Sequence, residues 1–347
     1  MSQAQTNNNP EVSASTSMLE MISSFWVSQT IYAAVKLGIA DYLQEQPRTA
    51  GELAEMTNTH APSLYRLLRA LTSVGIFTED ENHRFGLTRL GETLCTDCPG
   101  SLRFFAMIQL GQEHYRAWGN LLHSIKTGEV AFDNLVGMNV WDYYVKNPEN
   151  GKVFEQAMTN MTGSQIEAIM ASYDFSELSL VVDVGGGQGS LLTTILKAYP
   201  ELKGILFDTP TTIENVKPRL QANSDVGNRC TAVSGNFFES VPSGGDAYLM
   251  KFIIHDWDDE KAIAILKNCY RVMPENSKLL LFETIIPLGN EPFFGKLLDI
   301  NMLVMTGGRE RTESEYQVLL QAAGFQLNKI ISTPSPLSII EAVKCSG

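Results

Sequence analysis

The chain has 347 residues, a length at which one hydrophobic core usually gives way to two, so we expect two domains. Hydrophobic residues make up 44% and charged residues 19%, which excludes a fibrous or largely disordered protein. The formal net charge of −13 makes nucleic acids and anionic membranes unfavourable partners. The first basic residue is Lys36 and no apolar run is long enough to span a bilayer, so we expect a cytoplasmic protein.

The cysteines indicate neither a disulfide framework nor a metal centre. There are five, at scattered positions: Cys95, Cys98, Cys230, Cys269 and Cys345. Cys95 and Cys98 have the CxxC spacing, but no second pair follows at the spacing of a zinc site. We therefore expect ordinary thiols and no bound metal.

The N-terminal part predicts a short tail followed by helices. Residues 1–17 are polar and have nothing to bury, which predicts a disordered tail. Apolar residues then recur at helical spacing from Met18 to Leu43, with Gly38 as a stop, which predicts one or two amphipathic helices.

The next segment has the pattern of a winged helix. Thr49 and Glu52 form a capping box that should begin a short helix, and a second helix should run from Pro62 to Gly75. Residues 76–87 are β-branched and aromatic at both ends with a polar turn between, which predicts a hairpin. Together these elements place a winged-helix domain within residues 18–100.

A winged helix raises the question of DNA binding, and charge argues against it. Residues 41–85 carry four basic and seven acidic side chains, a net charge of −3. A surface of this sign is a poor reader of phosphates, so we expect the winged helix to pack against protein.

The remaining chain divides into a helical connection and an α/β domain. Residues 101–175 give helical patterns rich in Met and aromatic residues; such a stripe usually packs in a core, although Met also suits an adaptable pocket. From residue 176 to the C-terminus, strands alternate with helices, the pattern of a parallel sheet covered on both faces. The expected strands are residues 180–184, 204–207, 247–252 and 278–285, and the expected helices are residues 191–198, 260–272 and 313–323.

The first strand of this domain runs into a glycine-rich turn, Gly185-Gly186-Gly187-Gln188-Gly189, that precedes a helix. Glycines allow a ligand to approach the backbone closely, and a helix N-terminus favours negative charge. The spacing differs from the GxGxxG fingerprint of dinucleotide sites. Asp208 lies 25 residues after Asp183, at the end of the next strand, where a carboxylate is suited to accept both hydroxyls of a ribose.

Two further segments follow expected strand ends. Asn236 and Phe237 lie in Ser234-Gly235-Asn236-Phe237-Phe238, where an amide could hydrogen-bond an adenine and a phenyl ring could stack on it. His255 follows the strand that ends near Phe252, and an imidazole titrates near neutrality, which suits a general base.

Carboxylates that could orient this imidazole lie elsewhere in the chain. Glu283 ends a strand, and Glu310 lies in Gly307-Gly308-Arg309-Glu310-Arg311-Thr312, just before a capping box of Thr312 and Glu315. Asp256 and Asp258 are equally suited to cap the helix that begins after them.

Taken in order, these segments resemble the S-adenosylmethionine-dependent O-methyltransferases of the plant caffeate, hydroxyindole and bacterial polyketide type. The resemblance rests on Val181 to Gly189, Phe207-Asp208, Gly235 to Phe238, Lys251 to Glu260 and Gly307 to Thr312, and it extends over nearly the whole chain. It implies a Rossmann-like class I methyltransferase domain over residues 176–347, joined to an N-terminal winged-helix dimerisation domain. It also implies a homodimer, a small hydroxylated aromatic acceptor and no metal.

The resemblance also implies roles for individual residues. The cofactor site would comprise Asp183, Gly185, Gly187, Asp208, Asn236, Phe237 and the Lys251 backbone. The catalytic residues would be His255 as general base with Glu283, Glu310 and Asp256 around it. The acceptor pocket would include Asn301, Met302, Met305, Met158 and Trp257. Asn236 departs from the usual Asp at the adenine position, and an amide oxygen still accepts the adenine amino hydrogen.

Two alternatives remain open at this point. A relative with the same fold could carry out hydroxylation or decarboxylation, against which the presence of His255, Glu283 and Glu310 argues. A winged-helix regulator with a ligand-sensing domain is the other, and its acidic surface argues against it.

Overall fold

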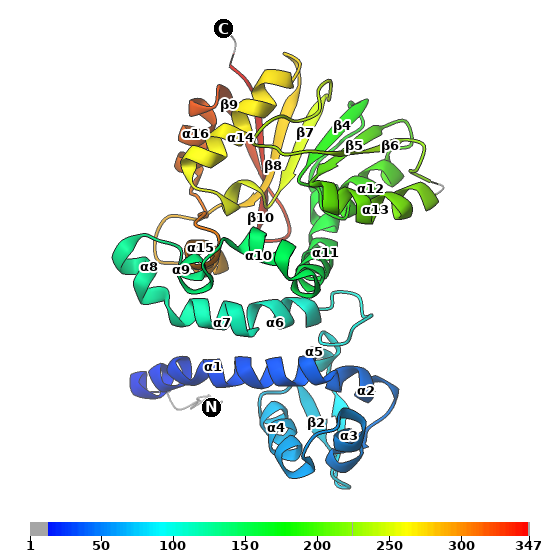
Figure 1. The fold of residues 1–347 in the computed structure, drawn as a ribbon, viewed down its shortest axis with the longest axis vertical. Coiled ribbons are helices and arrows are strands. Elements are labelled where there is room, and N and C mark those ends of the chain that lie inside the picture. The colour runs from blue at the N-terminus through cyan, green and yellow to red at the C-terminus, as the bar shows by residue number, and fades with distance from the viewer. Residues whose placement is uncertain (1–12, 224, 346–347) are drawn as a thin grey trace, which may run out of the picture. The chain divides into compact units, whose positions relative to one another are not determined.

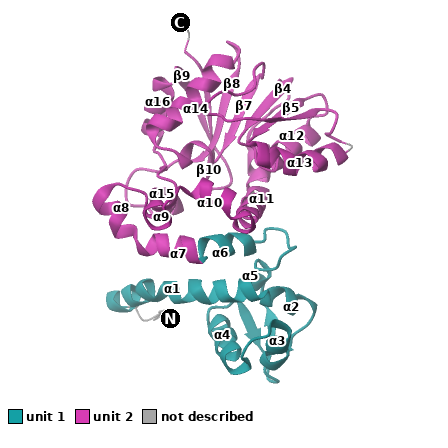
Figure 2. Ribbon diagram, viewed as in Figure 1, with its two compact units in different colours: residues 1–111 teal, residues 112–347 magenta. Residues whose placement is uncertain are grey.

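The computed structural model describes residues 13–223 and 225–345, which divide into two compact units, residues 1–111 and 112–347 (Figure 2). Most of the tail predicted for residues 1–17 lies outside the described residues. Its last four residues are helical, because Ser13 caps the first helix by accepting a hydrogen bond from the Thr16 amide, so the helix begins at Ala14.

The first unit contains the predicted helices and hairpin. The capping box of Thr49 and Glu52 is confirmed, and the hairpin gains a third strand in the order β1-β3-β2. The elements are α1 (Ala14–Leu37), α2 (Ile39–Glu45), β1 (Arg48–Thr49), α3 (Ala50–Thr57), α4 (Ala61–Ser73), β2 (Phe77–Glu79), β3 (Arg84–Leu87), α5 (Arg89–Glu92) and α6 (Arg103–Gln109).

Helix α1 presents much of its apolar surface to solvent. Of its 24 residues only Ala34 and Val35 are buried within the unit. Large apolar side chains near its start are 46–69% exposed: Met18, Leu19, Met21, Ile22, Phe25 and Trp26. An apolar helix face of this size is unusual for the surface of a small unit.

The second unit begins with helices and continues into the α/β domain. The helices before the sheet are α7 (Gln112–Gly119), α8 (Leu121–Thr127), α9 (Ala131–Val136), α10 (Val140–Lys146) and α11 (Pro148–Ser172). The α/β elements are β4 (Leu180–Val184), α12 (Ser190–Ala198), β5 (Lys203–Asp208), α13 (Pro210–Ala222), β6 (Cys230–Ser234), β7 (Ala247–Lys251), a short 3₁₀ helix (Ile254–Asp256), α14 (Asp259–Val272), β8 (Lys278–Thr284), α15 (Phe294–Met305), α16 (Glu313–Ala322), β9 (Phe325–Ser332) and β10 (Leu337–Lys344).

The sheet of the second unit has seven strands in the order β6-β5-β4-β7-β8-β10-β9. The first five are parallel, as predicted, and β10 pairs antiparallel with both β8 and β9. The chain builds outward from β4 through β5 to β6 and then returns to place β7 on the other side of β4. The strand order therefore reverses at β4 and β7, and in open sheets of this kind ligands bind at that point.

Helices cover both faces of the sheet (Figure 1). Helices α12 and α13 pack on one face with Val181 of β4, and α14 and α16 pack on the other face with Val182 and Val184. The alternation of these valines follows the period-two geometry of a strand buried on both sides. No helix in the described part of the chain is both long and apolar enough to cross a bilayer.

Helix α7 buries a histidine that the sequence did not single out. Nε2 of His114 lies 3.0 Å from the hydroxyl of Tyr144 on α10, and Nδ1 has no hydrogen-bond partner within the part of the chain that the structure describes. Burial lowers the pKa of His114 from 6.5 to about 4, because an imidazolium would lose its hydration there.

We expect His114 to make the second unit sensitive to acid. A histidine with a lowered pKa contributes full stability above pH 6.5 and loses it as the pH falls towards 4, since only the unfolded chain binds the proton in that window. Lowering the pH from 7 to 5 should reduce the free energy of unfolding by about 2 kcal/mol through this residue. Urea unfolding followed by tryptophan fluorescence reports on this unit, which contains Trp118, Trp141 and Trp257.

The His114→Gln variant should lose most of this pH dependence, because glutamine keeps a hydrogen-bonding group and does not titrate. His60→Gln is the matched control, since His60 is exposed. An unchanged pH dependence in His114→Gln would contradict the assignment.

Candidate active site

Five parallel strands bring predicted cofactor residues and the predicted catalytic residue Glu283 to one edge of the sheet. The turn at Gly185 follows β4, Asp208 ends β5, Asn236 follows β6, Lys251 ends β7 and Glu283 lies near the end of β8. Because these strands run in the same direction, their carboxyl ends meet at the same edge.

The glycine turn after β4 requires its glycines for two physical reasons. Gly185, Gly187 and Gly189 have φ values of +70°, +57° and +71°, a region that favours glycine. At Gly186 the reason is space, since a Cβ there would lie 2.5 Å from Oδ2 of Asp183. A Cβ at Gly187 would meet nothing within 4 Å, so this stretch of backbone is open to a ligand.

Asp208 braces the same turn. Its Oδ2 accepts a hydrogen bond of 2.8 Å from the Gly187 amide, and its Oδ1 accepts one of 2.7 Å from the Thr209 amide. The two contacts hold the carboxylate beside the glycine turn, at the end of β5. The structure thus brings together two of the residues predicted for the cofactor.

Asn236 and Phe237 lie on the loop after β6. Asn236 is exposed, and its Oδ1 accepts a hydrogen bond from the Phe238 amide while its Nδ2 donates to Glu239. The Phe237 carbonyl accepts from Nδ2 of Asn268 on α14, which fixes the loop to the body of the unit.

Asp183 and Lys251 lie on the adjacent strands β4 and β7, and each charge influences the pKa of the other. Burial raises the pKa of Asp183 to about 7, and the positive charge of Lys251 opposes this rise. Burial also lowers the pKa of Lys251 to about 8. Among the described residues, none is a hydrogen-bond partner of Oδ2 of Asp183, so the site holds a buried acceptor with capacity for a ligand donor.

His255 lies on the 3₁₀ helix after β7, with its side chain only 9% exposed. Its Nδ1 is 2.7 Å from Oε1 of Glu310 and 4.0 Å from Oε2 of Glu283. Its Nε2 is 3.7 Å from Oδ1 of Asp256. The structure therefore brings the four residues predicted for catalysis into one buried cluster.

The backbone holds both glutamates of this cluster in place. Oε1 of Glu283 accepts hydrogen bonds from the amides of Ile253 (3.2 Å) and Ile254 (2.9 Å). The amide of Glu310 donates to Oδ1 of Asp299 on α15. Asp258, by contrast, is the N-cap of α14, which confirms the capping alternative for that aspartate.

The electrostatics of the cluster favour a proton on His255. Burial alone would lower the pKa of His255, but the three surrounding carboxylates raise it well above its ordinary value. Burial raises the pKa of Asp256 and of Glu283 in turn. The groups are close enough to titrate as a unit, and the proton that the cluster binds resides mainly on the imidazole.

The ring of Phe252 stacks on the imidazole of His255. Its φ is +53°, in the left-handed region that a bulky residue rarely adopts, and its ring stacks on His255 at 5.0 Å between centroids. Backbone strain of this kind persists only where surrounding structure enforces it, which often happens at functional sites.

His255, Glu283 and Glu310 also place possible metal-ligand atoms within 4.8 Å of one another. Nδ1 of His255 is engaged with Glu310 in a hydrogen bond, so a metal ion here would have to displace that contact. That the enzyme needs no metal ion stays a prediction.

The predicted acceptor residues occupy different surroundings. Asn301 is buried on α15, where its Oδ1 accepts a hydrogen bond of 3.0 Å from the indole of Trp118. Met302 is buried on the same helix, whereas Met305 packs in an apolar cluster with Phe132 and other residues of α7 to α10. Met158 is half-buried on α11.

Trp257 belongs to a run of aromatic rings that the sequence analysis did not identify. Its ring centroid lies 6.1 Å from that of Trp141, which contacts Phe154, and Phe154 stacks on Tyr144 at 4.7 Å. Trp141, Tyr144 and Phe154 come from α10 and α11, so only their helical spacing could have indicated a shared face. The sequence also did not single out Asp299 or Arg311 as residues of the site, although Arg311 lies within Gly307 to Thr312.

The sequence matches two known domain families. The O-methyltransferase domain matches residues 118–326, and the O-methyltransferase dimerisation domain matches residues 19–97. The chain belongs to the O-methyltransferase family. This O-methyltransferase is 44% identical to a phenazine O-methyltransferase of Lysobacter antibioticus over 97% of its own length and 98% of that protein.

Solved structures agree with this assignment. The crystal structure of LaPhzM, 44% identical, matches with a TM-score of 0.93 over 96% of this chain and all of that one. An O-methyltransferase of neocarzinostatin biosynthesis, crystallised with S-adenosylmethionine and 2-hydroxy-5-methyl naphthoic acid, is 30% identical and matches with a TM-score of 0.84 over 97% of this chain and all of that one. The chain is an S-adenosylmethionine-dependent O-methyltransferase with a Rossmann-like catalytic unit.

The residues at the sheet edge fit this cofactor. The open backbone at Gly187 offers space, and the unpartnered oxygen of Asp183 offers an acceptor for a positively charged amino group. Asp208 offers a carboxylate at the end of β5, where a ribose would be held.

We expect Asp208→Ala to weaken binding of S-adenosylmethionine about 10- to 100-fold, because hydrogen bonds to a charged group contribute about 1.5–3 kcal/mol. Isothermal calorimetry in buffer with EDTA, using the cofactor and its demethylated product, measures this directly. Glu214→Ala on α13 is the control, since Glu214 is exposed on the helix that follows Asp208. Equal affinities in the wild type and Asp208→Ala would refute the ribose role.

Proposed function

We propose that this enzyme methylates a hydroxyl group of a small aromatic acceptor and uses His255 as the general base. The observation that carries the proposal is the 2.7 Å hydrogen bond between Nδ1 of His255 and Glu310. Because Nδ1 donates to that carboxylate, the neutral imidazole carries its lone pair on Nε2. The site therefore holds a base in one defined orientation.

The proposed role of His255 is to remove one proton from the acceptor hydroxyl. S-adenosylmethionine, when bound, supplies a methyl group activated by a positively charged sulfur. A phenol has a pKa of about 10 and is mainly neutral at pH 7, so its oxygen needs a base as it attacks. Nε2 takes the acceptor proton, and Glu310 and Glu283 stabilise the imidazolium that results.

The proposed cofactor contacts are Asp183, Gly185, Gly187, Asp208, Asn236, Phe237 and the Lys251 backbone. On the acceptor side, Asn301, Met302, Met305, Met158 and Trp257 remain proposed pocket residues. The packing of Met305 among core residues favours a supporting position for it behind Met302.

We infer a flat polycyclic aromatic as the acceptor class, with a hydroxyphenazine as the first compound to test. Two observations support this class. The phenazine O-methyltransferase is 44% identical over nearly the full length. The rings of Trp141, Trp257, Tyr144 and Phe154 are contiguous, and aromatic side chains favour flat aromatic partners.

We further propose that two copies of the chain assemble through the first unit. The match to the O-methyltransferase dimerisation domain and the exposed apolar face of α1 support this assembly.

We expect His255→Ala to slow methylation of a weakly acidic hydroxyl about 10²- to 10⁴-fold at pH 7, the range typical of a general base. A more acidic phenol on the same ring, already ionised at that pH, should lose much less because no proton remains to be removed. Single-turnover rates with the two acceptors measure the difference. The wild-type rate should also rise with pH, since the raised pKa of His255 means that neutral imidazole accumulates as the pH increases.

Calorimetry with S-adenosylmethionine provides the control, because the base should leave cofactor affinity unchanged. An unchanged rate on the weakly acidic acceptor would refute the general-base role and point to catalysis by positioning alone.

We expect Trp26→Glu to convert the dimer to a monomer in light scattering, because it places a charge in the apolar face of α1. Leu288→Glu is the matched control, since Leu288 is a large apolar residue of the second unit with 86% exposure. A dimer that persists in Trp26→Glu would contradict assembly through α1.

A further inference from the structure

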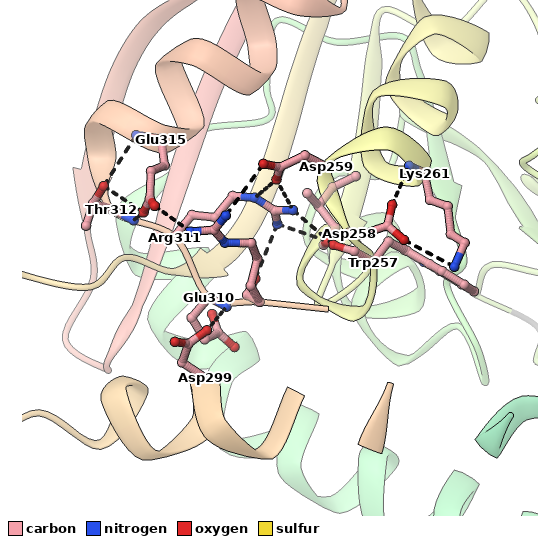
Figure 3. A network of polar contacts seen from close by, with 11 residues as sticks. Trp257, Asp258, Asp259, Lys261, Asp299, Glu310, Arg311, Thr312 and Glu315 are labelled. Carbon is pink, nitrogen blue, oxygen red and sulfur yellow. Dashed lines mark hydrogen bonds and ion pairs between the residues drawn. The ribbon is translucent and has the colours of Figure 1, made fainter. Parts of the chain in front are cut away.

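Arg311 is a buried arginine beside the catalytic cluster for which the proposed chemistry has no use. Its side chain is 1% exposed, which is rare for a permanent charge. It follows Glu310 directly in the chain, and its guanidinium forms several contacts that Figure 3 shows together.

The guanidinium holds both ends of the short segment that carries His255. Nη1 donates to the carbonyl of Ile254 (3.2 Å), and Nη2 donates to the carbonyl of Trp257 (2.9 Å). These two carbonyls lie immediately before His255 and after Asp256. A single rigid group therefore sets the path of the backbone on both sides of the base.

The same group also holds the segment that carries Glu310. Nη1 donates to the carbonyl of Arg309 at 3.2 Å, and the Arg309 amide donates to the carbonyl of His255 at 2.8 Å. A Cβ at Gly308 would lie 2.0 Å from that same carbonyl of His255, so the two segments are in direct contact. The carbonyl of Arg311 accepts from Ile286, just beyond the strand that carries Glu283.

A carboxylate on α14 fixes the guanidinium itself. Oδ1 of Asp259 accepts from Nε at 3.0 Å and from Nη2 at 2.7 Å (Figure 3). Asp259 and three backbone carbonyls accept hydrogen bonds from the Arg311 guanidinium. Its N–H donors are therefore largely satisfied, as a buried charge requires.

We propose that Arg311 is a positioning residue that keeps His255 in hydrogen-bond contact with Glu310, so that Nε2 of His255 is in place to take the acceptor proton. This inference rests on the proposed role of His255 as general base. Lysine has a point charge and no planar fork, so Arg311→Lys keeps the charge while losing the simultaneous contacts. The rate should then fall because the base is misplaced.

Arg229 offers a matched control at the opposite edge of the sheet. Its guanidinium also donates to backbone carbonyls, those of Leu196, Tyr199 and Leu202, near the amino end of β5. Arg229→Lys therefore removes the same kind of contacts without touching the segments of His255 and Glu310.

The experiment compares single-turnover rates on a weakly acidic hydroxyphenazine and on a more acidic phenol that is ionised at the assay pH. Arg311→Lys should slow the first about 10- to 100-fold, in keeping with an error of about 1 Å in position. It should change the second little and leave the affinity for S-adenosylmethionine unchanged. Arg229→Lys should affect the two acceptors equally. Equal losses on both acceptors in Arg311→Lys would overturn the proposal.

Two further variants make the outcome decisive. In a His255→Ala background, Arg311→Lys should cause no additional loss on the weakly acidic acceptor, because it acts through the base. An additive loss would overturn the inference. Asp259→Ala keeps Arg311 but removes its carboxylate partner, so it should slow the weakly acidic acceptor selectively and by a smaller factor. This variant replaces Arg311→Lys if Arg311→Lys does not fold. Full activity of His255→Ala alone would instead refute the general-base proposal itself.

Discussion

The burial of charge around His255 is the constraint on which this site depends. An imidazole and three carboxylates lie together, with Glu283 and Glu310 fully buried, and isolated charges at such depth would be strongly unfavourable. Each therefore needs a partner: Nδ1 of His255 for Glu310, and the amides of Ile253 and Ile254 for Glu283. The surrounding backbone supplies these partners, and Phe252, directly before the two amides, has a positive φ.

The same constraint bears on the proposed role of His255 as a general base. Carboxylates raise the pKa of His255 against the effect of burial, so the imidazole has a strong affinity for the proton of a hydroxyl group. A base of this kind must be held accurately to be useful, because proton transfer requires hydrogen-bond distance. Arg311 contacts the backbone on both sides of His255 and also next to Glu310, and so couples two segments that are distant in the chain.

The cofactor side of the site follows a different logic. There the sheet positions the proposed cofactor residues, because the carboxyl ends of β4, β5, β6 and β7 meet at one edge. The strand order reverses between β4 and β7. Glycines leave the backbone open at Gly187, and Asp208 braces the turn. The proposed acceptor side involves helices before the sheet, where Trp141 of α10 contacts Trp257.

Local pattern was enough to predict the parallel strands β4, β5, β7 and β8, the capping boxes at Thr49 and Thr312 and the glycine turn, because each depends on neighbours in the chain. Strand ends and residue chemistry pointed to His255, Glu283 and Glu310, and the resemblance to the O-methyltransferases implied the same roles for them. The sequence did not predict the hairpin of β9 and β10, the aromatic run through Trp141 or the hydrogen bonds of Arg311 to backbone carbonyls. The contacts of Arg311 with Ile254 and Trp257 join residues more than 50 positions apart, and the aromatic run joins helices with no fixed register between them. A sequence by itself specifies which side chains are suited to burial and hydrogen bonding. Only the packed tertiary structure decides which distant backbone carbonyls a buried guanidinium will meet.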